Sequence, residues 1–268
     1  MPDGEADARG PVAITLVTVG SNVVLAAAGF VAGAMNAVAG GGTFVTLPAL
    51  TLAGLPPTVA NASSTVALFP GTLASSWAYR EDVQPLDGVA TLALLILSLA
   101  GGLIGALLLL STPERAFTRI VPWLLLAATI ALALGPRLGQ GLRAVGLRMG
   151  RPALFIAQFI LGIYGGYFGG AVGLMMLAVW TLFTRAELRS MTPLRILMVA
   201  AANGVAVICF ALSGSIRWRE TVVVMAGGIA GGYLGAHAGK RLPAPVLRAL
   251  ILAITIVTTA GFFLRANA

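Results

Sequence analysis

Long apolar runs alternate with short polar stretches along the chain, and their lengths predict helices that cross a membrane. A helix of about 20 apolar residues spans the hydrocarbon core of a bilayer. Two further runs, 43–55 and 174–184, are shorter, and each directly follows a glycine-rich stretch. The longer runs cover residues 13–36, 62–79, 88–111, 119–135, 153–172, 194–213, 221–238 and 246–264. We therefore expect an all-α polytopic membrane protein of about ten transmembrane segments, two of them broken or half-length.

Glycine positions recur in the two halves of the chain. They are Gly29, Gly33 and Gly40 in the first half and, at a constant offset, Gly162, Gly166 and Gly173 in the second. The segment AGGLIGA at 100–106 also recurs as AGGYLGA at 230–236. Because each half holds an odd number of segments, duplicated halves insert with opposite orientations, as in many secondary transporters. We predict an N-terminal tail (1–12), a first repeat (13–135), an Arg-rich cytoplasmic linker (136–152) and an inverted second repeat (153–268).

Composition supports a membrane protein and narrows its chemistry. Hydrophobic residues make up 58% of the chain and charged residues 10%, against about 25% charged in ordinary soluble domains. All acidic residues lie in the tails or between apolar runs, which disfavours a pump built on a buried carboxylate. Cys209 is the single cysteine, so we expect no disulfide, no metal site and no cofactor. The net charge of +8 is scattered over short loops, and we expect no nucleic-acid partner.

The distribution of Lys and Arg predicts the orientation, because cytoplasmic loops are enriched in them. With the N-terminus outside, 11 of the 17 basic residues face the cytoplasm and 6 face outward. The linker 136–152 contributes four arginines, whereas Arg217 and Arg219 lie on the outer side. Residues 1–12 lack the basic region of a secretory signal, so we expect no cleavage. The sequence thus predicts a multi-pass protein of the cell inner membrane with both termini outside the cytoplasm.

The stretch 29–65 places a glycine triplet and polar residues in sequence that is otherwise compatible with lipid. The triplet Gly40, Gly41 and Gly42 follows Asn36 and precedes Thr43. Such glycines let the chain turn between a long and a short helix, and the free N–H groups at a helix start bind anions. Close packing of helices is the alternative explanation. We favour a polar pocket, because broken helices at membrane depth need polar surroundings.

A polar cluster follows the turn LPPT at 55–58. It consists of Asn61, Ser63, Ser64 and Thr65. Asn61 or Ser63 is a candidate N-cap for the next helix. Capping does not require all four residues, so we expect the cluster to add donors to the pocket at the glycine triplet.

The second half carries a thinner version of this pattern. Its break contains Gly169 and Gly170, next to Tyr167, and is followed by Arg195 and Asn203. Arg195 is either a fixed cation opposite an anionic substrate or a side chain that snorkels to the cytoplasmic interface. The Asn203 amide either bonds a neighbouring helix or lines the pocket.

The glycine pairs of the recurring AGG segments have a simpler interpretation. We expect them to be helix-packing surfaces. The pairs are Gly101 with Gly105 and Gly231 with Gly235.

These motifs, AGGGT at 39–43, LAGLPP at 52–57 and ANASST at 60–65, resemble the TauE/SafE sulfite exporter family of bacterial and plant membrane proteins. The resemblance covers nearly the whole chain and is strongest in residues 29–80. It implies transport of sulfite, thiosulfate or related organosulfur anions. It also implies substrate-binding roles for Asn36, Gly40, Gly41, Gly42, Thr43, Asn61, Ser63, Ser64 and Thr65. The second half departs from the pattern, with GGAVG at 169–173 in place of an unbroken glycine run.

The leading hypothesis is a secondary transporter that exports a small sulfur-containing anion by alternating access at a midplane site between broken helices. The candidate substrate-binding residues are those of the first half together with Tyr167, Gly169, Gly170, Arg195 and Asn203. A transporter of another small anion, such as a carboxylate, is the first alternative. A membrane scaffold or assembly factor without a transport cycle is the second. No enzyme motif is present. We expect a small anion and the lipid bilayer as partners, and the sequence leaves a homodimer open.

Overall fold

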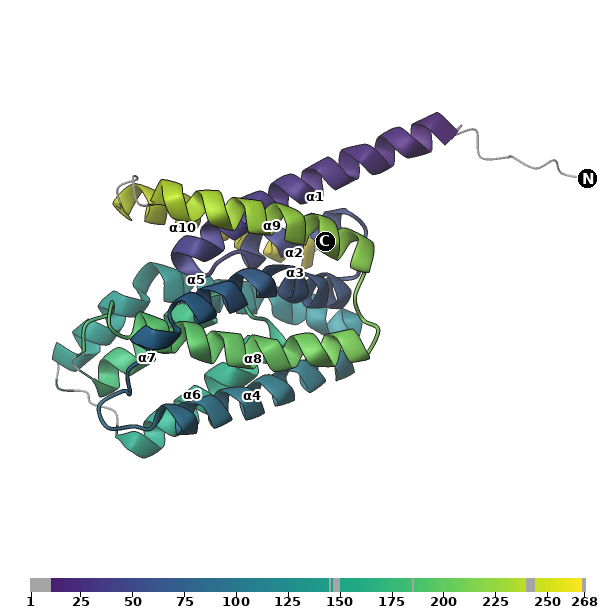
Figure 1. The fold of residues 1–268 in the computed structure, drawn as a ribbon. Coiled ribbons are helices and arrows are strands. Elements are labelled where there is room, and N and C mark those ends of the chain that lie inside the picture. The colour runs from purple at the N-terminus through teal and green to yellow at the C-terminus, as the bar shows by residue number, and fades with distance from the viewer. Residues whose placement is uncertain (1–10, 145, 147–149, 185, 240–243, 267–268) are drawn as a thin grey trace, which may run out of the picture.

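The computed structural model describes residues 11–144, 146, 150–184, 186–239 and 244–266 (Figure 1). These residues form ten α-helices and one short 3₁₀ helix, η1 (Arg80–Asp82), and their β-structure is confined to an isolated bridge between Leu86 and Val89. The α-helices are α1 (Pro11–Ala39), α2 (Thr43–Leu52), α3 (Pro57–Ala78), α4 (Thr91–Ser111), α5 (Glu114–Ala144), α6 (Arg151–Tyr167), α7 (Val172–Phe183), α8 (Thr192–Leu212), α9 (Trp218–Gly239) and α10 (Ala244–Ala266). The all-α prediction is confirmed.

The two predicted half-length helices are present. Helix α2 has 10 residues and helix α7 has 12, and each follows a glycine-containing break in the chain. The predicted boundary of the preceding run, 153–172, is wrong, because α6 already ends at Tyr167. Gly169 and Ala171 adopt φ values of +77° and +56°, which a right-handed helix cannot accommodate.

Two further boundaries differ from the predictions. Helix α3 begins at Pro57, and its N-cap residue Pro56 makes no side-chain cap. Asn61 and Ser63 therefore lie inside the helix, and neither is its N-cap. Proline is tolerated at the first helical position, where its missing N–H costs nothing, so the PP dipeptide begins the helix earlier than the polar cluster suggested. Helix α5 continues through Ala144, so the first part of the predicted linker 136–152 is helical.

The distribution of side chains is that of a protein surrounded by lipid. Large apolar side chains such as Leu92, Ile208 and Val257 are more than half exposed, whereas Asn61 and Gln158 are fully buried. By length and composition, three helical spans of the described residues can cross a membrane: Thr91–Ser111, Glu114–Leu134 and Thr192–Leu212. Shorter apolar helical stretches are Gly20–Asn36, Thr43–Leu52, Val172–Phe183 and Ala249–Leu264. The structure is consistent with a polytopic membrane protein.

Glycines bring two long helix pairs into backbone contact. Helix α1 packs along α9, and helix α4 packs along α6 (Figure 1). A Cβ on Gly33 of α1 would lie 2.0 Å from the carbonyl oxygen of Gly228 on α9, and one on Gly166 of α6 would lie 2.1 Å from that of Gly102 on α4. No larger side chain fits at these positions. The first helix of each half thus packs on the fourth helix of the other half.

The glycine pairs predicted to be packing surfaces lie in these same contacts. Gly101 and Gly105 of α4 approach the backbone of α6, and Gly231 of α9 approaches the backbone of Phe30 on α1. The prediction is confirmed for these three residues. Gly235 lies outside the residues whose side chains are described.

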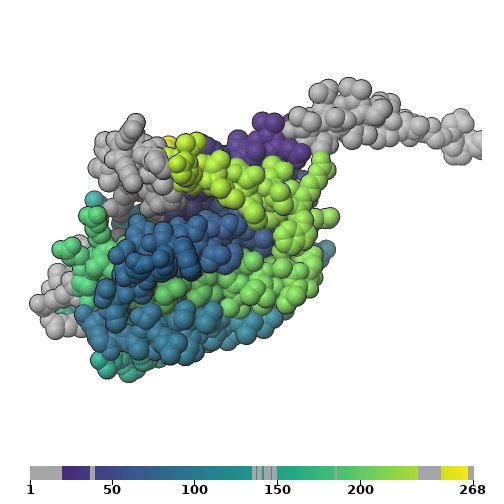
Figure 2. Space-filling view, in the orientation of Figure 1, coloured from purple at the N-terminus to yellow at the C-terminus, as the bar shows by residue number. Residues whose placement is uncertain are grey.

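Helix α3 lies at the centre of the fold and brings the polar cluster between the two halves. It contacts α2, α8 and α9. Figure 2 shows its C-terminal part, in dark blue, between α9 above it and α8 and α4 below it. Residues 60–68 of α3 are all buried, so the cluster is enclosed by the neighbouring helices.

Candidate functional site

The first helix break separates α1 from α2 and is closed by a side chain of α1. Gly40 adopts φ +74°, and the N–H of Gly42 donates to Asn36 Oδ1 at 3.2 Å. A Cβ on Gly42 would lie 2.7 Å from the carbonyl oxygen of Ala32, so only glycine fits there. The break therefore needs glycine for both conformation and space, and the side chain of Asn36 satisfies one of the N–H groups that start α2.

The second break separates α6 from α7 and lies directly beside the first. Its residues include Gly169 and Ala171, both in the left-handed region. The N–H of Ala171 donates to the carbonyl oxygen of Gly40 at 3.3 Å. Glycine-rich segments from the two halves of the chain are thereby joined through their backbones.

Polar side chains of helix α3 form hydrogen bonds or contacts beside both breaks. Ser64 Oγ lies 2.5 Å from Thr46 Oγ1 on α2. Asn61 Nδ2 donates to the carbonyl oxygen of Tyr167, the last residue of α6, at 2.9 Å. Thr65 faces the second break, because a Cβ on Gly169 would lie 3.6 Å from Thr65 Oγ1. The polar cluster thus contacts both breaks.

Arg195 of α8 lies beside the N-terminal turn of α7. A Cβ on Gly173, the second residue of α7, would lie 3.2 Å from both Cδ and Nη1 of Arg195. Arg195 Nε is buried without a hydrogen-bond partner, and within the described part of the chain no carboxylate pairs with this side chain. A guanidinium and the positive end of a helix dipole thus share one small region.

Unpaired amide oxygens accompany this cation. Asn61 Oδ1 and Asn203 Oδ1 are both buried without a hydrogen-bond partner. Asn203 belongs to α8, like Arg195, and its oxygen lies 3.9 Å from the Cβ position of Gly169. Unpaired buried polar atoms are rare and costly in folded proteins, and their concentration around one break makes this region the candidate site.

Some predicted site residues point elsewhere. Ser63 Oγ accepts a hydrogen bond from the N–H of Arg217, just before α9, at 3.2 Å. The Tyr167 hydroxyl donates to Thr112 Oγ1 at 3.3 Å, so this residue offers only its carbonyl group to the site. Thr43 and Gly170 are buried, and a Cβ on Gly170 would lie 2.6 Å from the Phe168 ring.

Sequence reasoning missed two residues that hold the site together. Thr46 bonds Ser64, and Ala171 bonds Gly40. Thr46 lies one turn after Thr43 on the same short helix, and this spacing is a signal that could have identified it. Alanine rarely adopts a left-handed conformation, so the residue type of Ala171 provides no signal for it.

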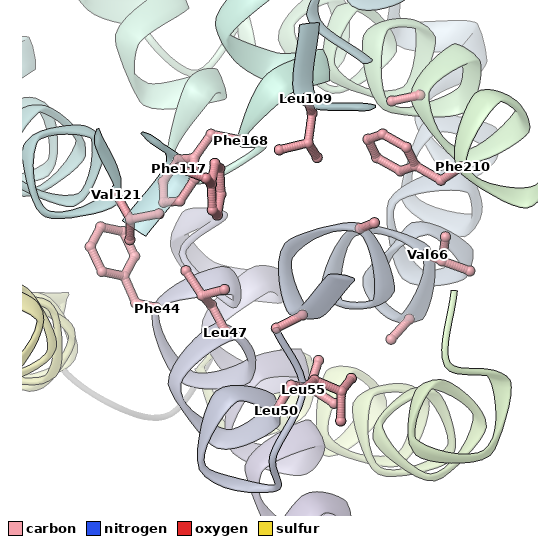
Figure 3. Packing of buried hydrophobic residues seen from close by; sticks show 14 of the residues in the cluster. Phe44, Leu47, Leu50, Leu55, Val66, Leu109, Phe117, Val121, Phe168 and Phe210 are labelled. Atoms are coloured by element: carbon pink, nitrogen blue, oxygen red, sulfur yellow. The ribbon is translucent and has the colours of Figure 1, made fainter. Parts of the chain in front are cut away.

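An apolar cluster packs against the two breaks. Phe44 of α2, Phe117 and Val121 of α5, and Phe168 of the second break are fully buried and lie together in Figure 3. A groove of about 810 Å³ lies elsewhere, lined by Leu73, Trp77 and other residues of α3, by residues near η1 and by one residue of α8. At the breaks themselves, the side chains of Asn61, Ser64 and Thr65 are buried. Within the described residues, His, Cys, Asp and Glu side chains form no group of three or more that could hold a metal ion.

Fold and site together are those of a multi-pass membrane protein with a polar centre built on broken helices. Comparison with known proteins agrees with this class. The family described as "Sulfite exporter TauE/SafE" matches residues 25–262. A "Probable membrane transporter protein" of Haemophilus influenzae is 30% identical over 239 residues, covering 88% of this chain and 92% of the relative.

Two further relatives carry similar descriptions. The "Probable membrane transporter protein YfcA" of Escherichia coli (strain K12) is 28% identical over 232 residues, covering 85% of this chain and 83% of its own. The "Probable membrane transporter protein ORF9" of a Sinorhizobium species is 28% identical over 237 residues, covering 85% and 87%. No solved structure matches the chain significantly. The chain belongs to the TauE/SafE family, and it is a membrane transporter rather than an enzyme.

Proposed function

We propose that this transporter exports a small sulfur-containing anion, such as sulfite, thiosulfate or a short sulfonate, through a site between its two helix breaks. The observation that carries the proposal is the buried, unpaired Nε of Arg195 next to the first turn of α7. A buried guanidinium N–H without a hydrogen-bond partner costs free energy, about 1–3 kcal/mol. An anion bound between Arg195 and the start of α7 would remove that cost and would also be favoured by the helix dipole.

An oxyanion of sulfur suits these groups. Its several oxygen atoms match the planar fork of N–H donors on a guanidinium. The hydroxyl groups of Thr46 and Ser64 bond each other at 2.5 Å, and Thr46 also donates to the carbonyl oxygen of Gly42. This pair fixes the first break, and with it the shape of the proposed site. We assign to this site Arg195, the first turn of α7 and the residues that hold the first break, and leave Ser63 out, since its hydroxyl accepts from the backbone just before α9.

The proposed transport cycle depends on two inverted repeats, α1–α5 and α6–α10. Helix α1 packs on α9, and α6, the first helix of the second half, packs on α4. Because each first helix packs on the fourth helix of the other half, this arrangement supports two halves related by a pseudo-two-fold axis. The bond between Gly40 and Ala171 lies where such halves would meet. In this account the enclosed site represents a closed state, and movement of one half against the other opens it to either side in turn.

The proposed direction is outward, across the inner membrane, with both chain termini outside the cytoplasm. A negative interior favours export of an anion by about 2.3 kcal/mol per charge per 100 mV. Export of this kind needs no coupling carboxylate, in keeping with acidic residues that lie outside the apolar runs.

Flux in liposomes tests the proposal. Purified protein is reconstituted with an imposed membrane potential, and efflux of sulfite, thiosulfate and a short sulfonate is compared with efflux of acetate. We expect potential-dependent flux of the sulfur anions and strong losses in Asn61→Ala and Ser64→Ala. Ser75→Ala, at a serine of the same helix α3 whose hydroxyl bonds the Gly71 carbonyl oxygen one turn away, is the matched control and should behave like the wild type. Preference for acetate would favour a carboxylate transporter, and absence of any flux would favour a scaffold.

A further inference from the structure

Three oxygen atoms from three helices lie within 4 Å of the position where a Cβ of Gly169 would be. A Cβ built there would be 3.6 Å from the carbonyl oxygen of Gly165, 3.6 Å from Thr65 Oγ1 and 3.9 Å from Asn203 Oδ1. Outside residues 168–170, these are the three nearest heavy atoms to that position. We call this space the oxygen pocket.

The two side-chain oxygens present lone pairs, not hydrogens, to the oxygen pocket. Thr65 Oγ1 donates its hydrogen to the carbonyl oxygen of Asn61 at 3.0 Å. Asn203 Oδ1 is buried and has no hydrogen-bond partner. Asn61 Oδ1, one turn before Thr65 on α3, is a further buried oxygen without a partner.

The carbonyl oxygen of Gly165 is available because the helix ends irregularly. In a continuing helix the N–H of Gly169 would bond Gly165. Here both Phe168 and Gly169 donate to the carbonyl oxygen of Tyr164, at 2.9 and 3.3 Å. The C-terminus of α6 also carries partial negative charge, which has the same sign as the oxygen lone pairs.

We propose that the oxygen pocket binds a monovalent metal cation, with Na⁺ as the probe. Buried amide, hydroxyl and carbonyl oxygens that lie close together without a donor between them favour a cation or a hydrogen-bond donor in their midst. All ligands are neutral, whereas Ca²⁺ and Mg²⁺ sites usually include carboxylates. Carbonyl oxygens at unwound helix ends suit Na⁺ at such positions. Such a site contains no His, Cys, Asp or Glu ligand.

The oxygen pocket lies two helical turns along α8 from Arg195, so the cation and the proposed anion occupy opposite ends of one break. Opposite charges at this separation stabilise each other, and each ion should raise the affinity of the other by the same factor. This role in transport rests on the proposed function, whereas cation binding itself does not. If the cation stays bound throughout the transport cycle, only the charge of the anion crosses the membrane.

Equilibrium binding of radioactive sodium to the purified full-length protein tests the inference, without anion substrate and with N-methyl-D-glucamine chloride holding the ionic strength. We expect saturable binding. Thr65→Val removes one ligand and should weaken the affinity roughly tenfold or more. Asn203→Asp keeps an oxygen and adds negative charge, so it should tighten binding. Thr72→Val is the matched control: Thr72 lies on α3 and makes the same local bond, to the Leu68 carbonyl oxygen, away from the break.

The outcomes separate this inference from the proposed function. Lack of saturable sodium binding in folded wild-type protein means that the pocket holds ordered water only, and overturns the inference. Equal affinities in wild type, Thr65→Val and Asn203→Asp overturn it too. Sulfite efflux measured on the same preparations gives the second comparison. Efflux without sodium binding leaves the proposed function standing, and sodium binding without efflux of any sulfur anion leaves only the cation site.

Discussion

The carbonyl oxygen of Gly40 accepts a hydrogen bond from the N–H of Ala171 at 3.3 Å, so the two helix breaks touch through their backbones. Each break lies before a short helix, and the two short helices belong to different halves of the chain. Relative movement of the halves must break this bond or carry both breaks together. In the proposed transport cycle, this contact would help to hold the closed state.

Ala171 offers a direct test of the strain at this contact. It adopts φ +56°, which costs a non-glycine residue roughly 1–2 kcal/mol. We expect Ala171→Gly to raise the free energy of unfolding by up to about 1 kcal/mol and Ala171→Val to lower it. Thermal unfolding of the protein in detergent measures both. The matched control is Ala178→Gly inside α7, which should destabilise by about 0.5–1 kcal/mol; equal effects of the two glycine substitutions would contradict a strained Ala171.

Glycines of α1 provide a second pair of matched substitutions. Gly33→Ala places a methyl group 2.0 Å from the carbonyl oxygen of Gly228 on α9, and should cost about 1–3 kcal/mol or prevent folding. Gly20 lies on the same helix with nothing within 4 Å of its Cβ position. Gly20→Ala should be neutral or stabilising by about 0.5–1 kcal/mol. Thermal unfolding of both variants in detergent checks the close α1–α9 contact. A Gly33→Ala variant as stable as the wild type would contradict that contact.

Patterns of apolar runs and glycines predicted the helices and both breaks because those features act locally. Lipid requires long apolar helices, and Gly40 marks a left-handed position that other residues avoid. The start of α3 was mispredicted, since polar residues that serve tertiary contacts resemble helix caps. Asn61 bonds the end of α6, a contact between residues far apart in sequence.

Side-chain direction within the candidate site was beyond sequence reasoning. Ser63 and Ser64 are adjacent in sequence, yet one bonds the backbone before α9 and the other bonds α2. Successive residues of a helix point about 100° apart, so a cluster of four cannot all face one pocket. For Arg195 the sequence left two interpretations open, a fixed cation or a snorkelling side chain, and the proposed function uses the first, with Nε buried beside Gly173.

Glu114 binds the N-terminus of α3 and supplies a third prediction. Its Oε1 accepts from the N–H of Thr58 at 3.2 Å, and its other oxygen accepts from the Thr58 hydroxyl. A carboxylate at a helix N-terminus contributes about 0.3–1 kcal/mol, so Glu114→Gln should lower the free energy of unfolding by about that amount. Glu187→Gln, at an exposed position, is the control. Indistinguishable unfolding curves for the two variants would show that the Glu114 contact adds no stability.

The initial rate of potential-driven sulfite efflux from liposomes containing Arg195→Gln tests the central claim most directly. Without the guanidinium, the proposed site loses its fixed cation, and we expect the rate to fall about tenfold or more. Arg195→Lys keeps the charge without the planar fork and should retain part of the rate. Arg189→Gln, an exposed arginine outside the site, should match the wild type. A wild-type rate for folded Arg195→Gln would contradict an anion site at the junction of the two helix breaks.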